Sequence, residues 1–387
     1  MTRDPALLEE CRALQRAVEP YPTLAALHAA PEWPAVAERF ARMLGTVRRV
    51  VADAPAIADA RASNRPDGVI AAHWNIEHGN WYEQVERALA RDETRRFGGP
   101  DLILLNEVDL GMARAGNRDV TADLARALGF HAAWVPMFLE TTLGRDDDAL
   151  TAHGSNNQES LFGLAILSRW PIGAARIVEL PSPDAIQFDL ERMIGRHVAL
   201  IAEIERPGQP FVAATVHLEV HRARSHRGAQ MRVLMEALAA ERRPVVLSGD
   251  FNSHTFDRGL WHSSMSAAWA LFTTPGDALR ERLLHPDRGP HHEPLFDALR
   301  EHGFEWERYV DFQRTLQLRF DRVDEARAFD LMRQLARPLV DWAVARGTLR
   351  LDWFAARGFA GGEGHTIAGL DGPGRASDHA PISARFI

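Results

Sequence analysis

The chain has 387 residues, of which 46% are hydrophobic and 25% are charged, a balance typical of a globular protein with a large core. All 45 basic residues are arginine, which excludes a Schiff-base lysine and a Walker-type phosphate lysine, and the net charge of −8 argues against broad, sequence-independent binding of nucleic acid. The single cysteine, Cys11, excludes an intramolecular disulfide and a thiolate metal cluster, and no apolar run is long enough to cross a bilayer. Because the N-terminus also lacks a hydrophobic signal core, we expect a cytoplasmic protein.

The first 65 residues are predicted to form a helical extension. Asp4 and Pro5 resemble a helix cap followed by a helix-starting proline, and apolar residues recur at helical spacing between Val36 and Val51. We expect residues 1–65 to pack against the rest of the chain. The alternative is a pair of helices that binds a partner.

Residues 66–387 are predicted to form the main domain, because short apolar runs bounded by turns replace the helical pattern. Predicted strands cover residues 69–74, 102–105, 161–167, 198–204, 211–216 and 245–247, and predicted helices cover 81–91, 122–128 and 226–240. This mixture predicts α/β structure layered around a sheet core. Residues 255–349 are mostly helical in pattern and hold 13 Arg against 15 Asp plus Glu. This stretch is long for a connection, so we expect a helical insert there.

Polar side chains follow the predicted strands at the points where the apolar runs end. The segments are NIEHG from residue 75, NEVD from 106, HLE from 217, SGDFNS from 248, LDWF from 351 and SDHAP from 377. A single carboxylate at a strand end is commonly a helix cap, but six such ends on one sheet would converge in an oxygen-rich pocket that suits Mg²⁺ or Mn²⁺. Hydrolysis of a phosphate ester needs such a cation, an oriented water and proton-transferring groups near neutral pH. The sequence therefore predicts this chemistry.

The ordered set WNIEHG, NEVD, TVHL, GDFNS, LDWF and SDHAP resembles the signature of the endonuclease/exonuclease/phosphatase superfamily. That superfamily includes deoxyribonuclease-I-like nucleases, apurinic-site endonucleases, neutral sphingomyelinases and inositol polyphosphate phosphatases. The match runs in order from about residue 69 to 387. The resemblance implies a four-layered α/β/β/α sandwich with the site at its rim, here with the N-terminal helical extension and the helical insert. A GLAILSR strand from residue 163 also resembles the family pattern, with Leu164 in place of the usual amide.

The resemblance also implies roles for individual residues. The metal ligands for Mg²⁺ (or Mn²⁺) would be Glu107 as the principal ligand, with Asp378, Asn75 and Glu77 beside it. The catalytic set would be His217, Asp250, Asn252, Asp352 and His379, in which Asp352 orients His379 and either Asp250 or His379 is the general base. The groups that hold the substrate phosphate would be Asn75, His217, Asn252 and Arg227. We expect structural roles for His78, for Glu219 and for a pair formed by Asp109 and Arg114.

Three functions remain open at this point. The leading hypothesis is a divalent-metal-dependent phosphodiesterase or nuclease that uses in-line attack of an activated water. The alternative is a phosphatase or phosphodiesterase acting on a small or lipid-linked phosphate, which the acidic net charge favours. The third is a non-catalytic binding module, which requires the loss of catalytic positions that the sequence retains. The substrate is a phosphate ester in either enzymatic case, and no protein partner is indicated.

Overall fold

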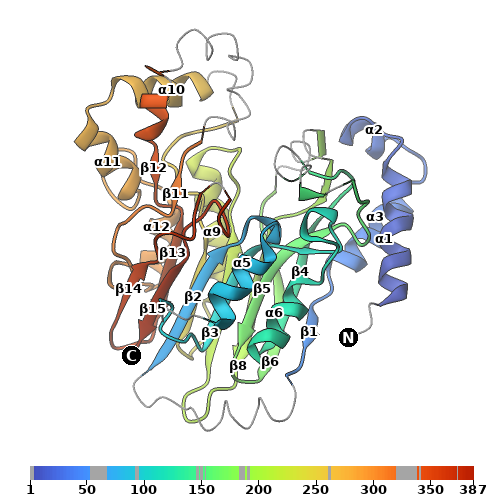
Figure 1. Cartoon of the computed structure of the whole chain (residues 1–387), viewed down its shortest axis with the longest axis horizontal. Coiled ribbons are helices and arrows are strands. Elements are labelled where there is room, and N and C mark those ends of the chain that lie inside the picture. Colours follow the sequence, from blue (N-terminus) through green and yellow to red (C-terminus); the bar gives the residue numbers. More distant parts are fainter. Residues whose placement is uncertain are drawn as a thin grey trace.

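The computed structural model describes residues 4–52, 68–91, 96–144, 148, 151–152, 154–182, 188–189, 192–259, 263–319, 338–339, 341–372 and 374–387. Within these residues, two large sheets stack face to face, and helices cover both outer surfaces (Figure 1). No helix among the described residues is both long enough and apolar enough to span a membrane.

The first sheet has eight strands in the described part of the chain, in the order β1-β4-β5-β3-β2-β15-β14, with β7 paired to β4. Its strands are β1 (Arg48–Val50), β2 (Val69–Asn75), β3 (Leu102–Leu110), β4 (His131–Glu140), β5 (Leu161–Ser168), β7 (Met193–Gly195), β14 (Gly362–Thr366) and β15 (Ile382–Phe386). The neighbours β2 and β3 run parallel, and β15 runs antiparallel to β2.

The second sheet has five strands among the described residues, in the order β13-β10-β9-β8-β6. They are β6 (Ile172–Glu179), β8 (Val198–Ile204), β9 (Phe211–His217), β10 (Val245–Asp250) and β13 (Asp352–Arg357). The strands β9 and β10 run parallel and so close together that a Cβ on Gly249 would collide with the main-chain oxygen of Val216. Glycine is therefore required at this position of the GDFNS motif.

Three cores hold the layers together. The central core lies between the sheets and contains side chains from both, such as Leu104 and Ile166 of the first and Leu200 and Val246 of the second. Helices on the first sheet enclose another core, and α9 and α12 enclose a third against the second sheet. These helices are α1 (Pro5–Val18), α3 (Trp33–Leu44), α5 (Tyr82–Glu86), α6 (Val120–Leu128), α9 (Arg224–Leu238) and α12 (Leu295–Glu301). The predicted α/β/β/α sandwich is therefore confirmed.

The described part of the N-terminal segment is joined to the first sheet. Its helices are α1, α2 (Leu24–His28) and α3, and buried side chains such as Cys11 and Phe40 belong to the same core as Trp74 of β2. The predicted helical face extended to Val51, but α3 ends at Leu44 and the chain then forms β1, which pairs with β4. The segment thus packs against the main domain and also lengthens its sheet.

The residues of the predicted insert, 255–349, separate into two groups. The helices α10 (Ser263–Thr273) and α11 (Gly276–Leu284) share a small core with β12 (Thr348–Leu349) and project beyond one end of the sandwich (Figure 1). The helix α12 instead contributes Leu295 and Phe296 to the core of the second sheet. Only the first group forms a separate subdomain, which we call the rim subdomain: α10, α11, β12 and β12's partner β11 (Leu316–Gln317).

Candidate active site

The predicted site residues meet at one end of the sandwich, where strands from both sheets terminate. Asn75 is the last residue of β2 in the first sheet, and His217 and Asp250 are the last residues of β9 and β10 in the second. Asp352 instead begins β13, and because β13 is antiparallel to β10, it lies opposite Asp250. We had expected the polar ends on a single sheet, and this was wrong. The two stacked sheets each supply part of the site.

Glu107 was expected to follow its strand. In the structure it lies inside β3. The pairing of β3 with β5 shifts register between Leu105 and Val108, and Glu107 has a positive φ of 54°. Such a bulge re-aims side chains without ending the strand. Glu107 Oε1 accepts a hydrogen bond from Asn75 Nδ2 at 3.0 Å, and the same amide nitrogen donates to Asp250 Oδ2 at 3.2 Å. One amide therefore connects carboxylates from the two sheets.

Asn106, which our sequence reasoning missed, connects the sheets beneath Glu107. It is fully buried, its Oδ1 accepts the main-chain N–H of Asp250 at 2.7 Å, and its Nδ2 donates to Thr215 Oγ1 at 3.1 Å. A buried amide in an otherwise apolar layer is stable only when its polar atoms are paired. The asparagine before the glutamate in the NEVD motif was the available signal.

The predicted pair of Asp352 and His379 is present. His379 Nδ1 donates to Asp352 Oδ2 at 2.7 Å, which leaves His379 Nε2 3.7 Å from Asp250 Oδ2. The other oxygen of Asp352 is 3.0 Å from Nε2 of His73, a fully buried β2 residue that we had not singled out. Asp352 therefore lies between two imidazole rings, and one of them faces the site.

The loop after β10 is connected to the loop after β9 through Asn252. Its main-chain N–H donates to Asp250 Oδ1 at 2.9 Å, and its Nδ2 donates to the carbonyl of Leu218 at 2.7 Å. His217 Nε2 lies 3.6 Å from Asp250 Oδ2. Asp250 is thus the centre of the cluster, with Asn75, His217, Asn252 and His379 around its carboxylate.

Burial and neighbouring charges separate the protonation behaviour of the site groups. Burial, together with the charge of Asp378, raises the pKa of Glu107 to about 8. Burial lowers the pKa of His217, partly offset by the charge of Asp250. Burial also acts to lower the pKa of His379, but the charges of Asp352 and Asp250 outweigh it and hold that pKa well above its usual value. Two histidines with opposite shifts suit different tasks in one reaction.

The donor set fits a hard divalent cation. Among the described residues, Asp250, Asp352 and His379 place potential ligand atoms within 4.8 Å of one another. Both oxygens of Asp352, however, already accept imidazole hydrogen bonds, so this residue has little capacity left for a metal. Glu107 and Asp378 remain the pair of ligands that we expect, because a cation would relieve the repulsion between their charges. The main-chain N–H of Glu77, which we also expected near the metal, donates to Asn75 Oδ1 at 3.2 Å.

The structure does not support a phosphate contact by Arg227. Its side chain is fully buried and forms a two-pronged ion pair with the equally buried Glu293, at 2.8 and 3.1 Å. Its remaining N–H groups donate to main-chain carbonyls, including those of Arg222 and Phe256. The guanidinium is therefore fully engaged inside the protein, and its role is to fix the loop that follows Asn252.

The residues expected to be structural lie close to the site. Arg114 forms an ion pair with Asp109 at 2.7 Å, as predicted, and both are buried. The ring of His78 lies with Nε2 3.4 Å from Glu107 Oε2, so this residue borders the site more closely than we expected. Glu219 is fully buried and accepts a 2.8 Å hydrogen bond from His197.

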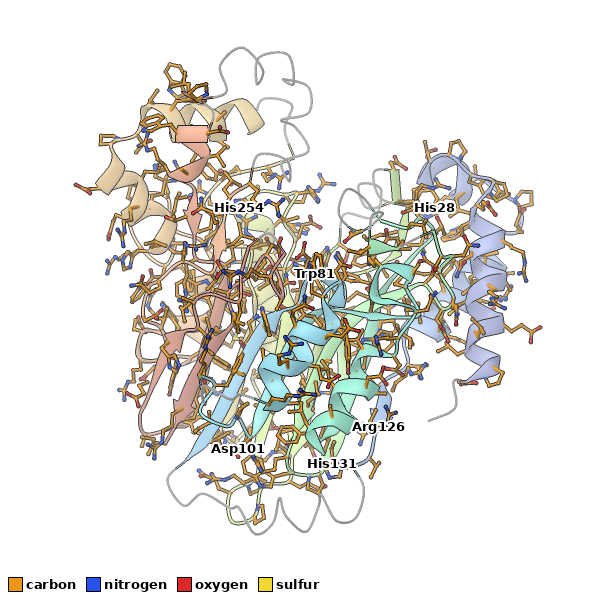
Figure 2. All side chains as sticks on the ribbon, viewed as in Figure 1. His28, Trp81, Asp101, Arg126, His131 and His254 are labelled. Carbon is orange, nitrogen blue, oxygen red and sulfur yellow. The ribbon has the colours of Figure 1, made fainter. Side chains whose placement is uncertain are left out.

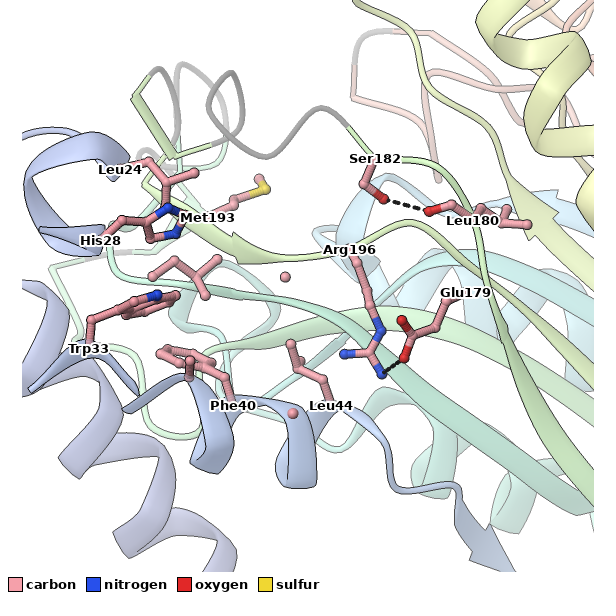
Figure 3. Close-up of a pocket in the computed structure, with 14 residues that line it drawn as sticks. Leu24, His28, Trp33, Phe40, Leu44, Glu179, Leu180, Ser182, Met193 and Arg196 are labelled. Atoms are coloured by element: carbon pink, nitrogen blue, oxygen red, sulfur yellow. Dashed lines mark hydrogen bonds and ion pairs between the residues drawn. The ribbon is translucent and has the colours of Figure 1, made fainter. Parts of the chain in front are cut away.

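A cavity of about 430 Å³ lies elsewhere, between α2 and α3 on one side and β7 on the other (Figure 3). Trp33, Phe40 and Met193 line its apolar part, and Arg196 pairs with Glu179 at its other end. None of the predicted site residues lines this cavity. We place the chemistry at the strand ends, because the convergent carboxylates, amides and histidines lie there.

Comparison with known proteins identifies a family. A sequence model described as the Endonuclease/Exonuclease/phosphatase family matches residues 72–379. An endonuclease/exonuclease/phosphatase from Beutenbergia cavernae DSM 12333 is 18% identical, with a TM-score of 0.48 over 83% of this chain and 71% of that one. A functionally unknown conserved protein from Enterococcus faecalis V583 is 17% identical, with a TM-score of 0.46 over 82% of this chain and 99% of that one. The human nocturnin catalytic domain with bound sulfate is 16% identical, with a TM-score of 0.42 over 84% of this chain and 94% of that one.

Among curated proteins, the match is local. The tRNA threonylcarbamoyladenosine biosynthesis protein TsaE of Mycobacterium tuberculosis H37Rv is 29% identical over 97 residues, which is 25% of this chain. The chain spans 57% of the length of that relative. So short a match shows neither a family nor an activity for this protein.

Proposed function

This chain belongs to the endonuclease/exonuclease/phosphatase family, whose members are metal-dependent phosphoester hydrolases, and from this premise we propose that it is a phosphodiesterase that acts by in-line attack of water on phosphorus. The observation that carries the proposal is the convergence of Asn75, Glu107, Asp250 and His379 at one rim of the sandwich. These groups supply cation ligands, a proton acceptor and hydrogen-bond donors within one small volume.

In this proposal, Glu107 and Asp378 hold the divalent cation. When bound, Mg²⁺ or Mn²⁺ would offset their charge and polarise a phosphoryl oxygen. Asn75 is already hydrogen-bonded to Glu107, so it couples the metal ligands to Asp250. This arrangement supports the assignment of Asn75 as a phosphate- and metal-proximal residue.

Proton transfer is assigned to Asp250 and His379. The carboxylate of Asp250 accepts the proton of the attacking water, and His217 and Asn252 hold that carboxylate and the phosphoryl oxygens in place. His379 keeps its proton at neutral pH, because Asp352 accepts from Nδ1, and presents Nε2–H toward the negative phosphoryl group. The opposite assignment, with His379 as the base, would require its Nε2 to be unprotonated.

A phosphatase or phosphodiesterase for small or lipid-linked phosphates is the second candidate. The rim subdomain favours it, because β11 begins beside the catalytic pair: Leu316 bridges to His379, and Thr315 Oγ1 accepts the main-chain N–H of Asp352 at 3.2 Å. A subdomain attached beside these two residues would restrict the size of substrate that can reach the site. The near-balanced charge of residues 255–349 also lacks the one-signed surface that tracks a long polyanion.

The test is hydrolysis of bis(p-nitrophenyl) phosphate with added Mg²⁺ or Mn²⁺, alongside supercoiled plasmid, single-stranded DNA, RNA and phosphomonoesters. We expect metal-dependent diester cleavage that excess chelator abolishes. Equal activity in chelator would contradict a metal-dependent hydrolase. Cleavage of monoesters alone would select the phosphatase alternative.

A further inference from the structure

His73 contacts Asp352, the hydrogen-bond partner of His379. It lies on β2, two residues before Asn75, and its side chain is fully buried between the sheets. Its Nε2 is 3.0 Å from Asp352 Oδ1, so the contact crosses from the first sheet to the second. The ring of Phe354 packs edge-on against it, with centroids 6.5 Å apart. The contact between His73 and Asp352 is thus a polar bond in an otherwise apolar layer.

The geometry of His73 identifies its tautomer. Its Nδ1 is buried without a hydrogen-bond partner among the described residues. An N–H at that position would be a buried donor left unpaired, which is costly. The proton on Nε2 therefore donates to Asp352. Asp352 consequently receives one imidazole N–H on each oxygen, from His73 on Oδ1 and from His379 on Oδ2.

This double contact fixes the plane of the Asp352 carboxylate. If His73 were removed, Oδ1 would lose its imidazole donor, and the carboxylate would turn to find another. Any such rotation moves Oδ2 away from His379 Nδ1, which it contacts at 2.7 Å. His379 would then lose the orientation that directs its Nε2 toward Asp250 and the substrate.

We propose that His73 is a positioning residue, which holds Asp352 so that His379 keeps one orientation toward the reacting phosphate. The proposal deepens the proposed function and rests on it for its activity readout, but the contact itself exists without substrate. His73 touches neither substrate nor reacting atoms. It acts through Asp352 alone.

Three substitutions test the proposal. His73→Gln keeps an N–H donor near the position of Nε2, His73→Asn keeps an amide that is too short to reach Asp352, and His73→Met removes the donor. For bis(p-nitrophenyl) phosphate, we expect kcat to fall on the order of 10- to 100-fold in the Met and Asn variants, as for other residues that orient a site group. We expect KM to change less than about 2-fold, and the Gln variant to recover most of the loss.

The matched control is His131→Met. His131 is another buried histidine of the first sheet, but it lies at the opposite end of the sandwich from His254 and the site loops (Figure 2). Its replacement should leave kcat unchanged even if it lowers the melting temperature. If the Met variant of His73 does not fold, the comparison of Gln with Asn decides the question.

A second readout does not depend on activity. In protein labelled with ¹⁵N in the histidine rings, the Nδ1–H proton of His379 should give a downfield signal, assigned by its loss in His379→Gln. The signal should survive in His73→Gln and be lost or shifted in His73→Met and His73→Asn. If the unmodified enzyme is active, and the folded Met and Asn variants keep both kcat and this signal, the proposal is wrong. If the unmodified enzyme is inactive but the signal responds as expected, the positioning role stands and the proposed function fails.

Discussion

Asp250 and Asp352 are register partners, the last residue of β10 opposite the first residue of β13. Two neighbouring carboxylates would repel each other, but the structure gives them different surroundings. Asp352 has both oxygens bonded to imidazoles, whereas the oxygens of Asp250 accept N–H groups of Asn252 and Asn75. We therefore propose that Asp352 orients His379 and that Asp250 takes part in the chemistry.

The first prediction concerns the principal metal ligand. Glu107→Gln should lower the affinity for Mg²⁺ or Mn²⁺ by about 100-fold or more, because a direct ligand contributes more to metal affinity than a residue that only orients a ligand. The variant should stay folded, since it removes a partly buried carboxylate that repels Asp378. Calorimetric metal titration and thermal unfolding measure both effects. Glu363→Gln, at an exposed position of β14, is the control and should bind metal normally. Unchanged metal affinity in Glu107→Gln would exclude this ligand.

The second prediction concerns pH. Because burial and Asp378 raise the pKa of Glu107 to about 8, this carboxyl group is largely protonated at pH 7 without metal. A cation binds the ionised form, so binding should release a proton. Apparent affinity should rise about tenfold per pH unit below pH 8 and level off above it. Calorimetry in two buffers with different ionisation enthalpies would detect the proton. An affinity independent of pH between 6 and 8 would contradict the assignment.

The third prediction separates chemistry from orientation. His379→Ala and Asp250→Asn should each lower kcat by several orders of magnitude with little change in KM, because their contacts strengthen in the transition state. Asp352→Asn should give a milder defect of the same kind, because it removes only the partner of His379. Steady-state kinetics on one diester substrate suffice. A silent Asp352→Asn beside a severe His379→Ala would contradict the pairing.

The fourth prediction concerns the rim subdomain and the size of the substrate. If this subdomain favours a compact phosphate ester, few phosphates are neutralised at once and binding should depend weakly on salt. A log–log slope of roughly −1 to −2 between 50 and 200 mM salt is expected for a substrate that makes one or two such contacts. A much steeper slope, together with rapid nicking of supercoiled plasmid, would favour a general endonuclease.

The fifth prediction concerns the buried pair of Arg227 and Glu293. Arg227→Met or Glu293→Gln alone should cost roughly 3–5 kcal/mol of unfolding free energy, because each leaves a buried group without its partner. The double variant should cost less than the sum of the two. Urea unfolding of the three variants measures this coupling. Additive costs, with KM raised only in Arg227→Met, would restore the phosphate-binding role.

The polar motifs could be identified from the sequence, but not all of their neighbours could. Asp250, Asn252 and His379 stand in short patterns whose chemistry is recognisable without coordinates. His73 stands in an apolar run, where a polar residue resembles an ordinary strand residue, and Asn106 precedes a glutamate that had already accounted for the motif. The role of each depends on its partner in the other sheet. His73 contacts Asp352, and Asn106 contacts Asp250 and Thr215.

Arg227 illustrates the opposite error. The position of Arg227 in a familiar pattern suggested phosphate binding. In the structure its guanidinium instead pairs with the buried Glu293, 66 residues further along the chain. The layered α/β structure and the identity of the oxygen- and imidazole-bearing groups could be predicted from the sequence, because strand periodicity and residue chemistry are local properties. Which carboxylate accepts from imidazoles and which from amide N–H groups depends on the tertiary structure. That depends on hydrogen bonds between strands of two stacked sheets, and no spacing along one chain encodes them.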